Sequence, residues 1–112
     1  MTDTALALAE ISHYVNSSYP PSVYSNDELT LRRRVGKVNV EAGELADAME
    51  GYTGENPRKG FYATKQDVMK ELLDTAAAAL AAYEHMNGNN ATCMLALNNH
   101  VMSNAARLGL IV

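Results

Sequence analysis

The chain has 112 residues, 13 Asp and Glu against 9 Lys and Arg, a net charge of −4 and one cysteine. This acidic balance disfavours a nucleic-acid partner, and a lone Cys93 excludes an intramolecular disulfide framework. No apolar run reaches the ~18 residues of a membrane helix, and Asp3 and Glu10 stand where a signal peptide places basic residues. We therefore expect one cytoplasmic domain over residues 1–112, with neither nucleic acid nor a membrane as partner.

The first expected element is a helix from Thr4 to Asn16, with Thr2 or Thr4 as its cap. Its apolar residues recur at helical spacing and are Leu8, Ile11 and Val15. Residues 17–26 contain a Pro-Pro pair, which cannot continue a helix. The chain is therefore expected to turn in this segment.

The second expected helix starts near Asp27 and carries the longest apolar seam. The seam alternates steps of four and three residues and consists of Leu31, Val35, Val38, Ala42, Leu45 and Met49. Gly36 and Gly43 each cost up to ~1 kcal/mol of helix propensity relative to Ala, so they are predicted to mark close helix approaches. Residues 51–60 hold three glycines and a proline, which predict a loop.

A third helix is expected to begin after Thr64, because Thr64 and Asp67 have the spacing of a capping box. Gly88 is placed to end it. Its predicted core positions are Val68, Leu72, Thr75, Ala79 and Ala82. The small side chains from Ala76 to Ala79 permit close packing of this helix.

A fourth helix is expected from Ala91 to Leu108, with Asn89 or Asn90 as its cap. Its predicted inward residues are Leu97, Val101 and Leu108. The expected fold is therefore all-α, a bundle of four helices. Such a short chain has more apolar face than four short helices can cover, so a homo-oligomer, either a dimer or a tetramer, is expected.

Two pairs of acidic residues are the candidate chemical groups. Glu41 and Glu44 lie three residues apart on the second expected helix, and Glu71 and Asp74 lie three apart on the third. Residues at this spacing share a helix face, so two antiparallel neighbours can bring all four carboxylates together. Hard oxygen ligands suit Mg²⁺, with Mn²⁺ as the alternative. Acids at this spacing are also common on solvated helix faces, and that interpretation stays open.

The acid pairs belong to a longer series of motifs within residues 31–82. Its blocks are Arg34-Val-Gly-Lys37, Glu41-Ala-Gly-Glu44-Leu-Ala, Thr53-Gly-Glu-Asn-Pro-Arg-Lys-Gly60 and Asp67-Val-Met-Lys-Glu71-Leu-Leu-Asp74. In content and order the series resembles the MazG-like all-α nucleotide pyrophosphohydrolases. One departure is Val40, since many members carry an acid there, directly before the acid that Glu41 matches.

The resemblance implies a MazG-type fold and a Mg²⁺-dependent reaction. The substrate would be a nucleoside or deoxynucleoside triphosphate, and the products would be the monophosphate and pyrophosphate. The resemblance assigns Glu41, Glu44, Glu71 and Asp74 as the metal-binding, catalytic set. Metal held there would bind phosphate oxygens and activate a water for in-line attack at the α-phosphorus.

Positive charge is needed to meet the leaving pyrophosphate. The candidates are Lys37, one turn before Glu41, and Arg58 and Lys59 in the Gly-bounded loop. Ordinary surface charge is the alternative interpretation of these three residues. The first and fourth helices match the family loosely, so the residues that select the base are not assigned.

Two other functions stay open from the sequence. One is a non-catalytic helical interaction module that keeps the fold, with Val40 marking decay of the site. The other is a pyrophosphohydrolase acting on phosphoribosyl-ATP, although the Asn56-Pro-Arg-Lys-Gly60 block resembles the MazG-like group more closely. Metal binding separates the first alternative from an enzyme, and a panel of nucleotide substrates separates the second.

Overall fold

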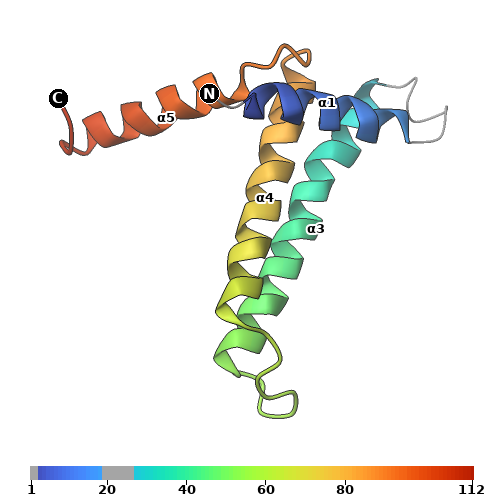
Figure 1. Ribbon diagram of the computed structural model, residues 1–112, viewed down its shortest axis with the longest axis vertical. Helices are drawn as coiled ribbons and strands as arrows, with labels where there is room; N and C mark the ends of the chain where they lie inside the picture. Colours follow the sequence, from blue (N-terminus) through green and yellow to red (C-terminus); the bar gives the residue numbers. More distant parts are fainter. Residues whose placement is uncertain (1–2, 19–26) are drawn as a thin grey trace.

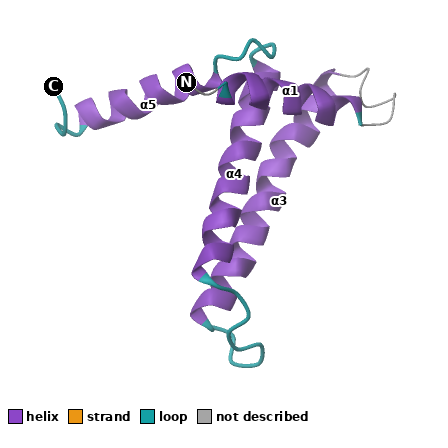
Figure 2. Ribbon diagram, in the orientation of Figure 1, coloured by secondary structure: helices purple, strands orange, loops and turns teal. Residues whose placement is uncertain are grey.

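The computed structural model describes residues 3–18 and 27–112, which form four α-helices and no strand (Figure 2). They are α1 (Thr4–Ser17), α3 (Asp27–Thr53), α4 (Lys65–Met86) and α5 (Cys93–Arg107). Helices α3 and α4 run antiparallel along each other as a long hairpin, α1 crosses one end of it, and α5 extends away from that same end (Figure 1). The expected all-α class is therefore confirmed. None of the helices described is both long enough and apolar enough to cross a membrane.

Helix α1 begins where the sequence predicted and ends one residue later. Its N-cap position is Asp3, which makes no side-chain cap hydrogen bond, so the prediction of Thr4 as the cap was wrong. Thr2 and most of the predicted Pro-Pro turn lie outside the described residues. Leu8 is buried with Ala81 of α4 in a small core where α1 crosses the hairpin.

A buried polar network holds α1 on the hairpin. Arg34 of α3 is 4% exposed and donates hydrogen bonds to the backbone oxygen of Ser12 at 2.7 Å and to Oδ1 of Asn16 at 3.0 Å. Nδ2 of Asn16 in turn donates to Nδ1 of His85 on α4 at 2.8 Å. Buried polar groups are costly unless they are paired. This network therefore favours one crossing position of α1 over others.

Acidification is expected to loosen this junction. Burial lowers the pKa of His85, the Arg34 charge lowers it further, and Asp27 opposes both. The stability that the neutral ring contributes is therefore present above its ordinary pKa of about 6.5 and is lost as the pH falls toward the lowered value. Urea unfolding between about pH 5 and about pH 8 should show this loss in the parent and a flatter profile in His85→Gln. The exposed His100→Gln is the control, and a parent-like profile in His85→Gln would contradict the assignment.

The apolar seams of the hairpin are only half covered. The covered or partly covered rows are Leu31, Val38 and Leu45 in α3 and Val68, Thr75 and Ala82 in α4. The exposed rows are Val35, Ala42 and Met49 in α3 and Leu72 and Ala79 in α4. Two helices bury only the stripe of residues along which they touch. In a four-helix bundle, further helices also cover the apolar residues on either side of that stripe. The described part of one chain therefore does not close the expected four-helix bundle.

Helix α5 also differs from the prediction in what it packs against. The residues expected to point inward are 38%, 53% and 64% exposed, and they are Leu97, Val101 and Leu108, respectively. The reason is visible in Figure 1, where α5 points away from the hairpin and only its start lies near α4. The prediction of an inward face on this helix was wrong for the single chain.

The start of α5 is capped from α4 and not by a neighbouring asparagine. Thr92 occupies the N-cap position, but its side chain makes no capping hydrogen bond to the helix, and its hydroxyl instead donates to Oδ1 of Asn90 at 2.6 Å. The fully buried carboxylate of Glu84 instead accepts the backbone N–H groups of Ala91 at 2.8 Å and Cys93 at 2.6 Å. A carboxylate stabilises a helix N-terminus because the free N–H groups carry partial positive charge. The prediction of Asn89 or Asn90 as the cap was wrong.

The close approaches predicted at two glycines occur elsewhere. Among the residues that the structure describes, nothing apart from the neighbouring backbone of α3 itself lies within 4 Å of where a Cβ of Gly36 or Gly43 would stand. A Cβ on Gly51 would instead lie 2.6 Å from the ring of Tyr62, whose N–H donates to the Gly51 oxygen at 3.1 Å. Gly51 thus lets the connecting loop fold back on α3, which continues past the predicted boundary to Thr53.

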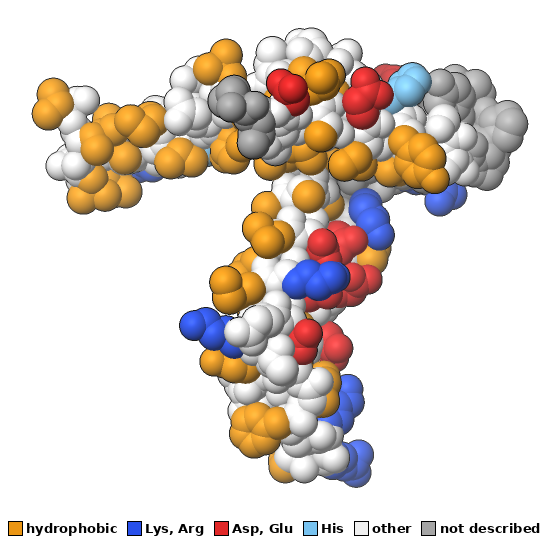
Figure 3. All heavy atoms as spheres, viewed as in Figure 1, with side chains coloured by type: hydrophobic (Ala, Val, Ile, Leu, Met, Phe, Trp, Pro, Cys, Tyr) orange, Lys and Arg blue, Asp and Glu red, His pale blue; other side chains and the backbone are white. Residues whose placement is uncertain are grey.

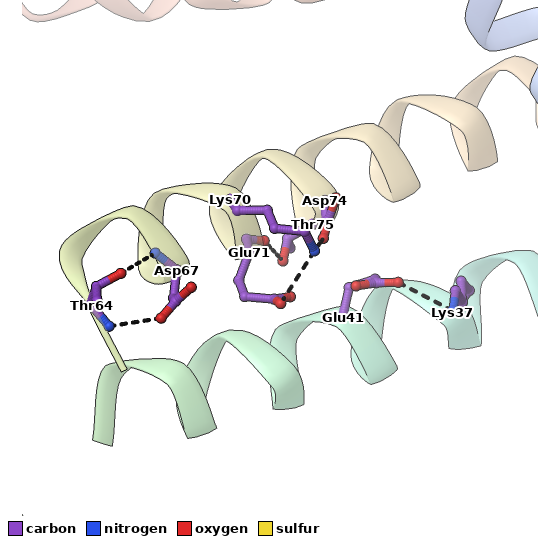
Figure 4. A network of polar contacts seen from close by, with 8 residues as sticks. All are labelled: Lys37, Glu41, Thr64, Asp67, Lys70, Glu71, Asp74 and Thr75. Carbon is purple, nitrogen blue, oxygen red and sulfur yellow. Dashed lines mark hydrogen bonds and ion pairs between the residues drawn. The ribbon is translucent and has the colours of Figure 1, made fainter. Parts of the chain in front are cut away.

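The beginning of α4 follows the predicted capping box. The hydroxyl of Thr64 accepts the N–H of Asp67 at 3.1 Å, and Oδ2 of Asp67 accepts the N–H of Thr64 at 2.8 Å (Figure 4). The two hydrogen bonds also lower the pKa of Asp67. Gly88, with φ of +84°, follows directly after the cap at the other end of the helix, as expected. This local start places Glu71 nearly two turns into α4, facing α3 (Figure 4).

Candidate metal centre

Three of the four predicted acids meet across the hairpin. Glu41 and Glu44 of α3 and Glu71 of α4 each offer a carboxylate oxygen, and these oxygens lie within 4.8 Å of one another. The side chains of Glu41 and Glu71 are 12% and 18% exposed and lie between the two helices (Figure 4). The spacing of three residues puts both α3 acids on one face, and the antiparallel pairing brings Glu71 opposite them.

The carboxylates of the cluster repel one another. The pKa of Glu44 is raised, chiefly by the charge of Glu41 and the hydrogen bond the two share, with burial and Glu71 adding to the shift. Lys37 opposes it. Like charges this close favour uptake of a proton or of a cation. The three carboxylates therefore form a candidate cation-binding site.

Asp74, the fourth predicted ligand, lies outside the group of three and is paired with a lysine that the sequence reasoning missed. Nζ of Lys70 lies 2.7 Å from Oδ2 of Asp74 and 3.6 Å from Oε1 of Glu71 (Figure 4). The hydrogen bond to Asp74 is the main cause that raises the pKa of Lys70. The signal for this contact was present in the sequence, because Lys70 and Asp74 are four residues apart on one helix.

The three predicted phosphate contacts differ in their positions. Nζ of Lys37 lies 3.2 Å from Oε1 of Glu41, so it stands at the edge of the cluster. Arg58 and Lys59 lie in the loop at the other end of the hairpin from α1 (Figure 1). Nζ of Lys59 lies 5.8 Å from the ring centroid of Tyr62. The structure therefore brings Lys37 to the acids and leaves Arg58 and Lys59 at the hairpin tip.

Two hollows flank the acids. The larger has a volume of about 560 Å³ and is lined by Val40, Gly43, Glu44, Asp47, Ala48, Tyr62, Ala63, Asp67, Lys70 and Glu71. The smaller, of about 310 Å³, is lined by Leu8, Ile11, Val15, Arg34, Lys37, Glu41, Asp74, Ala77, Ala78 and Ala81. Figure 3 shows acidic and basic side chains gathered on this face of the hairpin, below α1. The acid cluster therefore borders a hollow on each of two sides.

Two further acids in the larger hollow are already engaged. The hydroxyl of Tyr62 donates to Oδ1 of Asp47 at 3.0 Å, and burial together with this bond raises the pKa of Tyr62 to about 12. Asp67 is held in the capping box of α4. Tyr62 and Asp47 were not among the residues predicted from the sequence. They are fifteen residues apart, and Gly51 leaves room for the Tyr62 ring where the loop folds back on α3. Glu44 and Glu71 are the lining acids left to face a cation.

The donor set fits a hard divalent cation. Oε2 of Glu71 is buried and has no hydrogen-bond partner within residues 3–18 and 27–112. A buried carboxylate oxygen without a hydrogen-bond partner is costly, so a cation bound at this oxygen would stabilise it. Carboxylate oxygens are the ligands that Mg²⁺ and Mn²⁺ prefer. The residues that would hold the ion are Glu41, Glu44 and Glu71.

The chain matches no protein-family model, and neither the curated proteins nor the solved structures contain a significant match. A functional assignment therefore depends on the geometry of the acid cluster and on the motifs that place its residues.

Proposed function

We propose that this protein is a Mg²⁺-dependent nucleoside triphosphate pyrophosphohydrolase of the MazG-like type. The observation that carries the proposal is the convergence of Glu41, Glu44 and Glu71 between two hollows. Lysines stand beside the cluster on each helix, Lys37 on α3 and Lys70 on α4. A triphosphate substrate needs both the carboxylates and the lysines. The carboxylates hold the metal ion that activates a water for hydrolysis, and the lysines bind the negatively charged phosphate oxygens.

In this proposal the carboxylates bind the metal ion and the lysines bind the phosphates. Glu41, Glu44 and Glu71 hold the divalent ion, which when bound supplies Lewis-acid activation of water and neutralises phosphate charge. Lys37 and Lys70 provide ammonium groups to the phosphate oxygens, because charged hydrogen bonds to phosphate are strong. Mn²⁺ is the alternative ion for the same ligands.

The smaller hollow is the proposed place for the nucleoside. Its apolar wall consists of Leu8, Ile11 and Val15 of α1 and Ala77, Ala78 and Ala81 of α4. Glu41 lines the same hollow, so a nucleoside there would carry its phosphates toward the cluster. Arg58 and Lys59 would have to move from the hairpin tip to reach the phosphates, and Lys37 and Lys70 take that role in this proposal.

A substrate panel tests the function. Purified protein is incubated with Mg²⁺ and each of the common ribonucleoside and deoxyribonucleoside triphosphates, and with phosphoribosyl-ATP. Release of pyrophosphate together with the monophosphate is measured against a control containing chelator. Chelator-sensitive release from a nucleoside triphosphate supports the proposal. Release from phosphoribosyl-ATP alone favours the second pyrophosphohydrolase, and no release from any compound excludes both enzymes.

One observation keeps a non-catalytic module as the second candidate. Val40 is 53% exposed and lines the larger hollow, where many members of the resembled family place an acid. A protein of this kind would keep the hairpin and bind a partner without turnover. Absence of both Mg²⁺ binding and hydrolysis in the parent would favour it.

We further propose that the working form is a homodimer or homotetramer. The radius of gyration is 17.0 Å, against about 13 Å for a compact chain of this length. The accessible surface is 7862 Å², about 1,800 Å² more than expected for a compact monomer of this mass. An excess of this size matches what each subunit buries in an obligate dimer.

The exposed rows of the hairpin are the proposed interface. Val35 and Ala42 on α3 and Leu72 and Ala79 on α4 are exposed, and a second hairpin on them would complete a four-helix bundle. Ala42 follows Glu41 by one residue, which turns it about 100° around α3 away from the cluster. A dimer formed through these rows would therefore leave the acids accessible.

Light scattering is expected to show a dimer or tetramer at micromolar concentration. Val35→Glu combined with Ala79→Glu should shift it to monomer, because buried unpaired charges are costly at an interface. Leu6→Glu is the matched control, since Leu6 is 50% exposed on α1 and lies outside these rows. A parent that is only monomeric would refute the assembly, and dissociation by Leu6→Glu alone would place the interface elsewhere.

A further inference from the structure

Lys70 is the basic group among the described residues that line the larger hollow. It lies one residue before Glu71 and four before Asp74, and its Nζ contacts both carboxylates, at 3.6 Å and 2.7 Å. It therefore links an acid of the cluster to the acid that stands outside it (Figure 4).

The contact that Lys70 makes is suited to being exchanged. Its side chain is 69% exposed and that of Asp74 is 41% exposed, so the ion pair is largely solvated. Exposed pairs of this kind are weak. A lysine also carries its charge at the end of a flexible four-carbon stem. A cation of higher charge at the carboxylates can therefore displace it at little cost.

We infer that Lys70 is an exchangeable internal cation: its single positive charge pairs with Glu71 and Asp74 in the metal-free protein, it is displaced from Asp74 when a divalent ion binds, and it then binds the pyrophosphate part of the substrate. The inference rests on the proposed function, since it concerns the same site. It also accounts for the position of Asp74, which Lys70 holds at the edge of the cluster. Once Lys70 leaves, the Asp74 carboxylate is available to the bound cation.

Lys37, the other lysine at the site, does not link an acid of the cluster to an acid outside it. Lys37 pairs with Glu41, an acid that already belongs to the cluster, and lines the smaller hollow. Its departure would free no further carboxylate from outside the group of three. Lys70 lines the hollow into which Glu44 and Glu71 open, so it is the lysine that can pass between acid and phosphate.

The experiment measures two binding constants by calorimetry on the full chain, that of Mg²⁺ alone and that of inorganic pyrophosphate with saturating Mg²⁺. Lys70→Met keeps most of the aliphatic stem and removes the charge. We expect it to bind Mg²⁺ about two- to fivefold more tightly, because competition and repulsion are both removed. It should bind pyrophosphate about tenfold more weakly, because a charged contact to phosphate is lost.

Exchange predicts that Lys70→Met changes the two affinities in opposite directions, tighter for Mg²⁺ and weaker for pyrophosphate. A substitution that only disturbed the fold would weaken both. Lys70→Arg should keep pyrophosphate binding within about threefold of the parent. Lys65→Met is the matched control on the same helix, because Lys65 is exposed and lines neither hollow. It should leave both constants within about twofold.

Each outcome decides the matter. Unchanged or weaker Mg²⁺ binding in Lys70→Met would overturn the competition between lysine and metal. Unchanged pyrophosphate binding would overturn its role toward phosphate. A parent that binds no divalent ion would overturn the proposed function itself and this inference with it, which distinguishes the two failures.

Discussion

Glu44→Gln is expected to lower the rate of pyrophosphate release from nucleoside triphosphates by about a hundredfold or more, and so is Glu71→Gln. The amide nearly preserves the shape of the side chain and removes its charge, so the divalent ion loses a ligand and the water loses its activation. Asp74→Asn should also reduce the rate by orders of magnitude, because Asp74 faces the cation once Lys70 has left it. The measurement is steady-state release of pyrophosphate at saturating Mg²⁺.

The stability of these variants separates a metal centre from a structural role. Removing one of three clustered charges relieves repulsion, so the metal-free fold of Glu44→Gln should be as stable as the parent or slightly more stable. Glu10→Gln, an exposed acid on α1, is the control and should keep activity within about twofold and stability within ~0.5 kcal/mol. Cluster variants that hydrolyse triphosphates as fast as the parent would end the proposal that these acids form the catalytic centre.

Mg²⁺ is expected to raise the melting temperature, because it binds the three converged carboxylates of the native state and finds no such site in the unfolded chain. At a concentration about tenfold above its dissociation constant the ion adds about 1.4 kcal/mol of stability. For a domain of this size that corresponds to an increase of about 5 °C. Thermal unfolding followed by circular dichroism, with Mg²⁺ or with chelator, measures it.

Two controls make this result specific to the cluster. NaCl at matched ionic strength screens repulsion among surface acids but does not bind in a carboxylate group of this kind, so it should give a smaller increase. Glu71→Gln should lose most of the Mg²⁺-dependent increase, since the buried Oε2 of Glu71 has no hydrogen-bond partner in the described part of the chain. Identical melting of the parent in Mg²⁺ and in chelator would count against a metal centre.

The ends of the helices that depend on local chemistry were predictable. The capping box of Thr64 and Asp67 starts α4 as the sequence indicated, because both hydrogen bonds of the box lie within four residues. The cap of α5 was not predictable in this way. It comes from Glu84, which is nine residues from Cys93 and reaches it only because the chain turns back on itself.

The sequence by itself determined the class of fold, most helix boundaries and the presence of two acid pairs on helix faces, because periodicity, breakers and caps act over a few residues. Only the tertiary structure decided that Glu41, Glu44 and Glu71 converge while Asp74 stays with Lys70. Periodicity places a residue on a face but does not set the relative position of two helices along their axes. That position depends on contacts between residues far apart in the chain, such as the loop folded against α3 at Gly51 and the buried network of Arg34.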